Sequence, residues 1–161
     1  MASCTRLIRT TILPALAGLL VFLYLPLARA DYVPFPGRIP VTVVGVESPR
    51  DVVVSYETWP GFRRDTVVRL PGVVVPEDTP GSPPCERELA ARALAFTRGF
   101  IDDASRVWIQ DMRMETSADP VGYSDVLTDH GSLKAALTAA GLARSETHAS
   151  GGGWCHEQAA Q

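Results

Sequence analysis

Three stretches in the first half of the chain show the alternation and the β-branched residues that predict strands: Val41–Val46, Asp51–Glu57 and Thr66–Val75. In the second stretch, Val52 and Val54 fall on one face, which we expect to be the buried one. The third stretch contains Pro71-Gly72, and a proline interrupts strand pairing unless an edge or a bulge accommodates it. We therefore expect this strand to bend there.

The second half of the chain predicts two helices with two strands between them. A helix from about Glu86 to Ala104 carries an apolar stripe at helical spacing, made of Leu89, Ala93, Phe96 and Phe100. The strands are Val107–Met114 and Tyr123–Thr128. Strict alternation in the first of them puts Ile109 and Asp111 on one face and Met112 and Met114 on the other. The second helix follows His130-Gly131, is capped by Ser132 and ends before Gly141.

The order of these elements is three strands, a helix, two strands and a helix, preceded by an extended lead-in over Asp31–Pro40. Five short strands with a helix after the third predict a mainly β or α+β fold. Its most specific form is a five-stranded OB-type barrel with two to three helices. The alternative is an α+β domain of no particular type.

Residues 1–30 predict a secretory signal peptide. Arg6 and Arg9 precede a long apolar run, and Ala28-Arg29-Ala30 has the small-x-small pattern of a cleavage site. We expect cleavage after Ala30 and a periplasmic or secreted protein, with an uncleaved membrane anchor as the alternative. The expected organisation is then a domain over residues 31–148 and a C-terminal tail over 149–161 tied by a disulfide.

The net charge argues against one class of function, and the cysteine count predicts a disulfide. The whole chain has a formal net charge of −3, and loss of residues 1–30 leaves 12 basic against 18 acidic residues, or −6. Such a chain is not suited to strong non-specific binding of nucleic acid, which depends on Lys and Arg. Cys85 and Cys155 remain after cleavage, and an even count in an exported protein predicts a disulfide. Two free thiols are the alternative.

Several segments, in order, resemble the staphylococcal nuclease (thermonuclease) family, and in particular its small exported bacterial members. The run from Arg69 to Glu77 is similar to the family motif Arg-x-x-Gly-Ile-Asp-Thr-Pro-Glu, and the run from Cys85 to Ala93 to its Cys-x-x-Glu-x-x-Ala-x-x-Ala helix start. Gly131–Ala143 resembles the C-terminal helix, and Gly153-Trp154-Cys155 the terminal cysteine segment. The resemblance implies an OB barrel and calcium-assisted hydrolysis of DNA or RNA phosphodiesters.

The resemblance assigns catalytic roles to Arg69 and Glu77, which match the first arginine and the glutamate of the family. The calcium-binding Asp of the motif is replaced by Val74, and only Asp51 is left as a metal ligand, one residue out of register. The second arginine falls at Gly122. Arg113 is near in sequence but lies in the preceding predicted strand.

These departures predict an eroded phosphodiesterase site, with weak or no nuclease activity and a binding role. Nucleic acid is then a weakly bound partner, and no membrane contact remains after signal cleavage. The alternative is an active calcium-dependent endonuclease on single-stranded DNA or RNA that uses Arg69 and Glu77. Calcium is the cofactor if the enzyme is active, and otherwise there is none. Arg69 also has a purely structural interpretation, as a strand arginine paired with Glu77 or Asp65.

Overall fold

A computed structural model describes residues 32–116, 120–147 and 153–155. Contacts divide the chain into residues 1–30 and 31–161, and the fold below is that of the second unit. The predicted signal peptide and most of the predicted tail lie outside the described residues. Within the described ranges, no helix is long and apolar enough to cross a membrane.

The described part of the chain is mostly strand, with two helices. The strands are β1 (Tyr32–Ser48), β2 (Asp51–Trp59), β3 (Phe62–Arg69), β4 (Val73–Val74), β5 (Val107–Glu115), β6 (Gly122–Thr128), β7 (Gly131–Ser132) and β8 (Arg144–Ser145). The helices are α2 (Pro84–Asp102) and α3 (Leu133–Ala139). This confirms the mainly β or α+β class.

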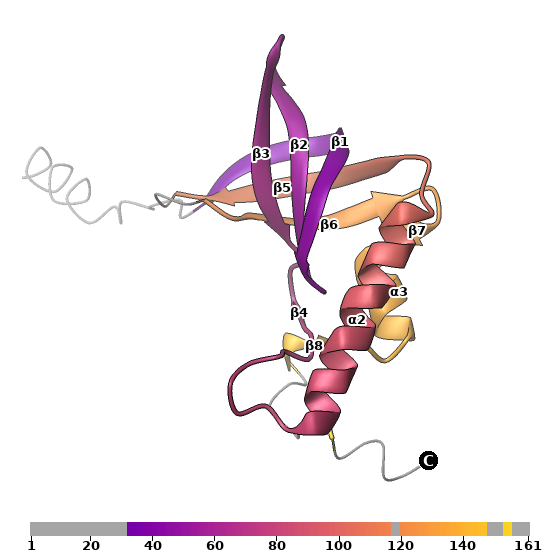
Figure 1. The fold of residues 1–161 in the computed structure, drawn as a ribbon. Helices are drawn as coiled ribbons and strands as arrows, with labels where there is room; N and C mark the ends of the chain where they lie inside the picture. The colour runs from indigo at the N-terminus through magenta and orange to yellow at the C-terminus, as the bar shows by residue number, and fades with distance from the viewer. Residues whose placement is uncertain (1–31, 117–119, 148–152, 156–161) are drawn as a thin grey trace, which may run out of the picture. The chain divides into compact units, whose positions relative to one another are not determined.

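Six strands form one sheet in the order β3-β2-β1-β5-β6-β7, and β4 pairs with β8 in a separate two-stranded sheet (Figure 1). Neighbours in the large sheet are antiparallel. In addition, β6 pairs in parallel with β3, through Val68 with Gly122 and Arg69 with Tyr123. The pairings therefore return from β6 to the strand at which the order begins.

Strand β1 is longer than the sequence predicts. From residue 32 the expected extended lead-in over Asp31–Pro40 is part of the strand, because residues 32–41 pair with β5 while residues 42–48 pair with β2. The prolines are accommodated by a register shift between Phe35 and Arg38. There Gly37 has a φ of +88°, and its N–H donates to Asp111 Oδ1 at 2.8 Å instead of to the ladder.

The predicted third strand, Thr66–Val75, is two separate strands. β3 begins earlier, at Phe62, and ends at Arg69. After a turn in which Gly72 has a φ of +71°, Val73 and Val74 pair with β8 instead of continuing the sheet. The break at Pro71-Gly72 thus sends the chain to a different partner.

Strand β5 does not alternate throughout, so the predicted faces were wrong after Gln110. The pairing with β6 shifts between Gln110 and Arg113, and Asp111 has a φ of 49°. The inserted residue moves the following side chains to the other face. As a result Ile109, Met112 and Met114 are all buried.

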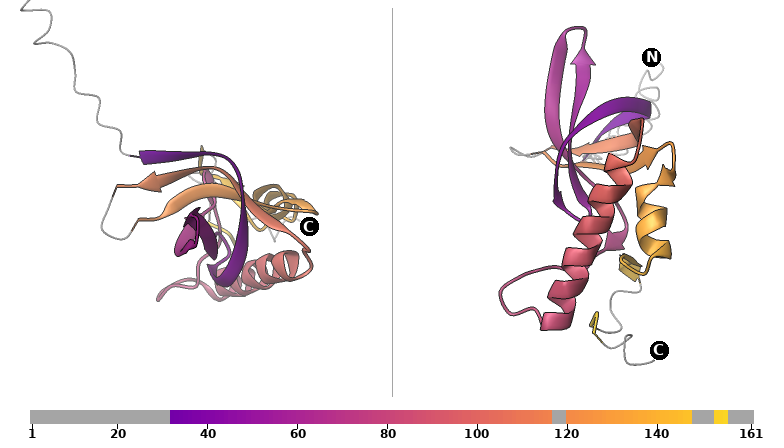
Figure 2. Two further views of the ribbon diagram at one scale, coloured as in Figure 1. Left: turned by 90° about the horizontal axis from the view of Figure 1, so that it is seen from above. Right: turned by 45° about the vertical axis from the view of Figure 1, so that its right-hand side comes forward.

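The helices cover the core next to the sheet, and α2 lies beside α3 (Figures 1 and 2). The buried residues of α2 are Leu89, Ala90, Ala93, Thr97 and Ile101. Phe96 and Phe100 are only partly buried, so the buried stripe is rotated from the predicted one. Helix α3 matches its prediction: Ser132 Oγ accepts from Ala135 N–H, and Gly141 follows the helix with a φ of +67°.

Candidate functional site

The turn between β1 and β2 forms hydrogen bonds within itself, to helix α2 and to the residue that follows β3. Ser48 Oγ accepts from the Asp51 backbone N–H at 3.0 Å and donates to Asp51 Oδ2 at 2.9 Å. The carbonyl of Pro49 accepts a buried hydrogen bond of 2.9 Å from Thr97 Oγ1 of α2. The carbonyl of Arg50 accepts from Leu70 N–H at 2.9 Å. The turn is therefore fixed to α2 and to the end of β3.

Asp51 and Arg69 are cross-strand partners on β2 and β3 and form a bidentate ion pair. Arg69 Nε donates to Asp51 Oδ1 at 2.7 Å and Arg69 Nη2 to Asp51 Oδ2 at 3.1 Å. The Asp51 side chain is 13% exposed and that of Arg69 33%. Hydrogen bonding to Asp51 raises the pKa of Arg69 above its usual value. The structural alternative that paired Arg69 with Glu77 or Asp65 is wrong, because Asp51 is the partner.

Glu77 faces a different arginine, Arg50. Arg50 Nη2 lies 3.6 Å from Glu77 Oε1, and Arg50 Nη1 donates to the carbonyl of Val73 at 3.3 Å. The Glu77 side chain is 56% exposed, against 23% for Arg50. In this pair, the guanidinium of Arg50 is fixed by its hydrogen bond to Val73, whereas the side chain of Glu77 remains open to solvent.

The three residues that the sequence singles out, Asp51, Arg69 and Glu77, line one cavity of about 450 Å³. Its walls come from the β1–β2 turn, the end of β3, residues 75–79, and Ala90, Ala91 and Leu94 of α2. Arg50 also lines this cavity, which we call the Arg50 cavity. Sequence reasoning missed Arg50, although its place beside Asp51 in the same turn was a usable signal.

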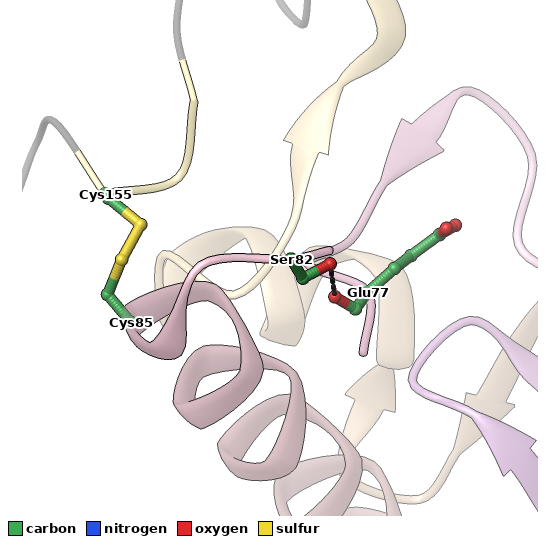
Figure 3. Close-up of a disulfide and its surroundings, with 4 residues drawn as sticks. All are labelled: Glu77, Ser82, Cys85 and Cys155. Carbon is green, nitrogen blue, oxygen red and sulfur yellow. Dashed lines mark hydrogen bonds between the residues drawn. A yellow bond between two sulfur atoms is a disulfide. The ribbon is translucent and has the colours of Figure 1, made fainter. Parts of the chain in front are cut away.

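The segment after Glu77 is tied back on itself before α2 begins. Ser82 Oγ donates to the backbone carbonyl of Glu77 at 3.0 Å and lies 2.8 Å from Thr79 Oγ1. Figure 3 shows this contact and the Glu77 side chain pointing away from the disulfide. Cys85, in the first turn of α2, is bonded to Cys155 with a Cα–Cα distance of 5.9 Å, as predicted from the cysteine count. These links fix the segment from which Glu77 extends.

The residues at this site do not fit calcium. Both oxygens of Asp51 are used by Arg69, and Glu77 faces a guanidinium. Val74, which stands where the family motif has a ligand, offers no oxygen from its side chain, whereas Ca²⁺ takes six to eight oxygen ligands. Across residues 32–116, 120–147 and 153–155, no three His, Cys, Asp or Glu side chains are grouped so that they could hold a metal ion.

Arg113 does not join the Arg50 cavity. It is the cross-strand partner of Tyr123, which in turn pairs with Arg69. Arg69, Tyr123 and Arg113 line a second cavity of about 400 Å³, to which Lys134 also contributes. Tyr123 Oη donates to Glu115 Oε1 at 2.6 Å. Arg69 thus borders both cavities, while Glu77 borders only the Arg50 cavity.

Trp59 and Trp108 have the kind of side chain on which nucleic-acid bases stack, and they lie in different surroundings. Trp59 is 71% exposed at the tip of the β2–β3 hairpin, close to Phe62, which is 67% exposed. Trp108 is partly buried and has the guanidiniums of Arg38 and Arg106 over its ring, at 5.6 and 5.2 Å from the centroid. Of these two residues, only Trp59 presents most of its surface to solvent.

No protein-family model matches this chain, and no curated protein is significantly similar to it.

Proposed function

We propose that this chain is an exported thermonuclease-like protein built on a five-stranded OB-type barrel, with an eroded phosphodiesterase site and a binding role. The barrel interpretation is supported by the order β3-β2-β1-β5-β6 and by the pairing of β6 back to β3. Export is supported by the joined Cys85 and Cys155, since disulfides persist in oxidising compartments.

One observation carries the proposal: Asp51, Arg69 and Glu77 come from three separate segments and line the same cavity. These are the residues that the family resemblance selects. Erosion is supported by Val74 in place of an aspartate and by the use of Asp51 as the partner of Arg69. Loss of one group that stabilises a transition state commonly costs about 10²–10³ in rate. Loss of both a metal ligand and a second arginine leaves weak or no nuclease activity.

The second candidate is an active calcium-dependent nuclease on single-stranded DNA or RNA. It is favoured by Glu77, whose side chain is more than half exposed and lines a cavity that Arg69 also lines. In this case Glu77 acts on the attacking water and Arg69 binds the phosphate. Calcium would then need ligands other than Asp51, whose two oxygens are used by Arg69.

A cleavage assay separates the two candidates. The exported, disulfide-bonded protein is incubated with single-stranded DNA and with RNA, in calcium or in chelator, beside Glu77→Gln and Val74→Asp. Glu88→Gln, an exposed glutamate of α2 away from the cavity, is the matched control. We expect no calcium-dependent cleavage by the parent. Cleavage that appears only in Val74→Asp would show a nuclease scaffold disabled mainly at its metal site. Calcium-dependent cleavage by the parent that is lost in Glu77→Gln but kept in Glu88→Gln would contradict the erosion proposal.

A further inference from the structure

The Arg50 cavity contains more negative than positive charge. Four carboxylates line it, from Glu47, Asp51, Glu77 and Asp78, against the guanidiniums of Arg50 and Arg69. Asp51 and Arg69 neutralise each other through two hydrogen bonds. Arg50 is then the remaining positive group of the cavity, and its nearest carboxylate is Glu77.

Arg50 is held more firmly than an ordinary surface arginine. Its N–H donates to Ser48 Oγ at 3.3 Å, and its carbonyl accepts from Leu70 N–H. At the other end of the side chain, Nη1 donates to the carbonyl of Val73. Because backbone and guanidinium are both fixed, the position of the positive charge is set by the fold.

We propose that Arg50 is the resident cation of this cavity and excludes a divalent metal from it. The proposal rests on the proposed function only in taking the Arg50 cavity as the ligand site. A divalent ion that approached Glu77 would meet the guanidinium of Arg50, whose Nη2 lies 3.6 Å from Glu77 Oε1, and the two positive charges would repel each other. It would also find no carboxylate at position 74. Any phosphate group that the cavity binds would therefore contact the arginines directly, without a metal.

Calcium binding tests this inference without nucleic acid. The exported protein is stripped of metal, and calcium is added while the melting temperature and the heat of binding are followed. Val74→Asp places a carboxylate at the position that the family resemblance assigns to a metal ligand, and it is combined with Arg50→Gln, with Arg50→Lys, or with Arg98→Gln. Arg98 is exposed on α2 and does not line the cavity, so Arg98→Gln changes the net charge equally.

We expect no calcium-dependent shift in the parent, in Arg50→Lys/Val74→Asp or in Arg98→Gln/Val74→Asp. Arg50→Gln/Val74→Asp should bind calcium with a millimolar Kd, and 10 mM calcium should then raise its Tm by roughly 4–6 °C. Arg50→Lys tests the charge apart from the shape of the group, because lysine keeps the positive charge without the planar guanidinium that contacts both Glu77 and the Val73 carbonyl.

Two results would overturn the inference. One is millimolar or tighter calcium binding by the parent, which requires no variant to fold. The other is a folded Arg50→Gln/Val74→Asp protein, judged by circular dichroism, that responds to calcium no more than Arg98→Gln/Val74→Asp. If Arg50→Gln does not fold, the parent and Arg50→Lys/Val74→Asp decide, since calcium binding by either contradicts a cation at this position. Calcium binding is measured without nucleic acid, so the inference can fail while the parent still shows no cleavage, and that outcome is distinguishable from a failure of the proposed function.

Discussion

The two turns at the ends of strand β2 both begin with a proline, but one packs against other elements and the other is exposed to solvent. Pro49-Arg50 joins β1 to β2, and Pro60-Gly61 joins β2 to β3. The first is tied to α2 and β3 and lines a cavity. The second ends a hairpin that extends past the other strands, and all residues from 57 to 65 are exposed (Figures 1 and 2). A two-residue turn that begins with proline is therefore part of a fixed site at one end of β2 and part of an exposed tip at the other end.

The difference shows that long-range contacts, and not the turn itself, create the site. At the free tip, Gly61 has a φ of +83° after a proline, the pattern of a type II turn, and the nearest polar contact is Glu57 Oε1, which accepts from Gly61 N–H. At the fixed turn, the partners Thr97 and Leu70 are 48 and 20 positions away in the sequence. At the fixed turn, these long-range partners hold Arg50 and Asp51 in position.

The largest effect should come from Asp51→Ala. It removes both hydrogen bonds to Arg69 and the bond from Ser48, and it leaves a half-buried guanidinium without its carboxylate. We expect a loss of about 2 kcal/mol in the free energy of unfolding. Urea denaturation measures it, with Asp65→Ala at the exposed hairpin as the matched control. Equal losses in the two variants would remove the distinction between the turns.

Thr97→Val should have the next largest effect. It keeps the shape of a buried residue but leaves the carbonyl of Pro49 without its hydrogen bond. The expected loss in the free energy of unfolding is about 1–2 kcal/mol. Thr138→Val, which removes an exposed bond to the Lys134 carbonyl, should cost less than about 0.5 kcal/mol. If Thr97→Val left the free energy of unfolding unchanged, α2 would not hold the turn.

A third turn, after β6, contains a carboxylate that is hydrogen-bonded but not buried. Asp129 is exposed and accepts from Ser105 Oγ at 2.6 Å and from Ser105 N–H at 3.1 Å, and the bond from the Ser105 side chain lowers the pKa of Asp129. Its contribution to stability is therefore present above the unfolded-state value of about 3.9 and is lost as the pH falls through the folded-state pKa. Asp129→Asn should weaken the acid dependence of the melting temperature. An acid dependence identical to that of the parent would contradict this.

The smallest effect should come from Trp59→Ser at the free tip. The side chain is 71% exposed, so its removal should change the free energy of unfolding by less than about 0.5 kcal/mol. Thermal denaturation beside Phe62→Ser measures it. A loss above about 1 kcal/mol would mean that the tip packs against something in solution.

The same contrast explains what the sequence could predict. Helix α3 was predictable because its signals are local: Ser132 at its start, Leu133 and Leu137 on one face, and Gly141 past its end. The face of Val52 and Val54 was predictable for the same reason, and both are fully buried. The bulge at Asp111 was not predictable, because it depends on a distant residue. The Asp111 side chain accepts a hydrogen bond from the backbone N–H of Gly37, 74 positions away in the sequence.

The candidate site divides in the same way. Asp51, Arg69 and Glu77 were selected by a motif, and the cavity brings all three together. Their partners were not predictable, because β-sheet register decides that Asp51 faces Arg69, and the break after β3 decides that Val73 accepts from Arg50. The loss of Asp51 as a free carboxylate therefore became visible only in the folded chain.

The central claim is that the Arg50 cavity, and not the hairpin tip, is the ligand site. Its most direct test is chemical-shift mapping of the disulfide-bonded, isotope-labelled protein, titrated with a short single-stranded oligonucleotide in chelator. We expect shifts at the amides of Arg50, Asp51, Arg69 and Glu77 and none at Trp59 or Phe62. Shifts confined to Trp59 and Phe62, or no shifts at millimolar oligonucleotide, would contradict it.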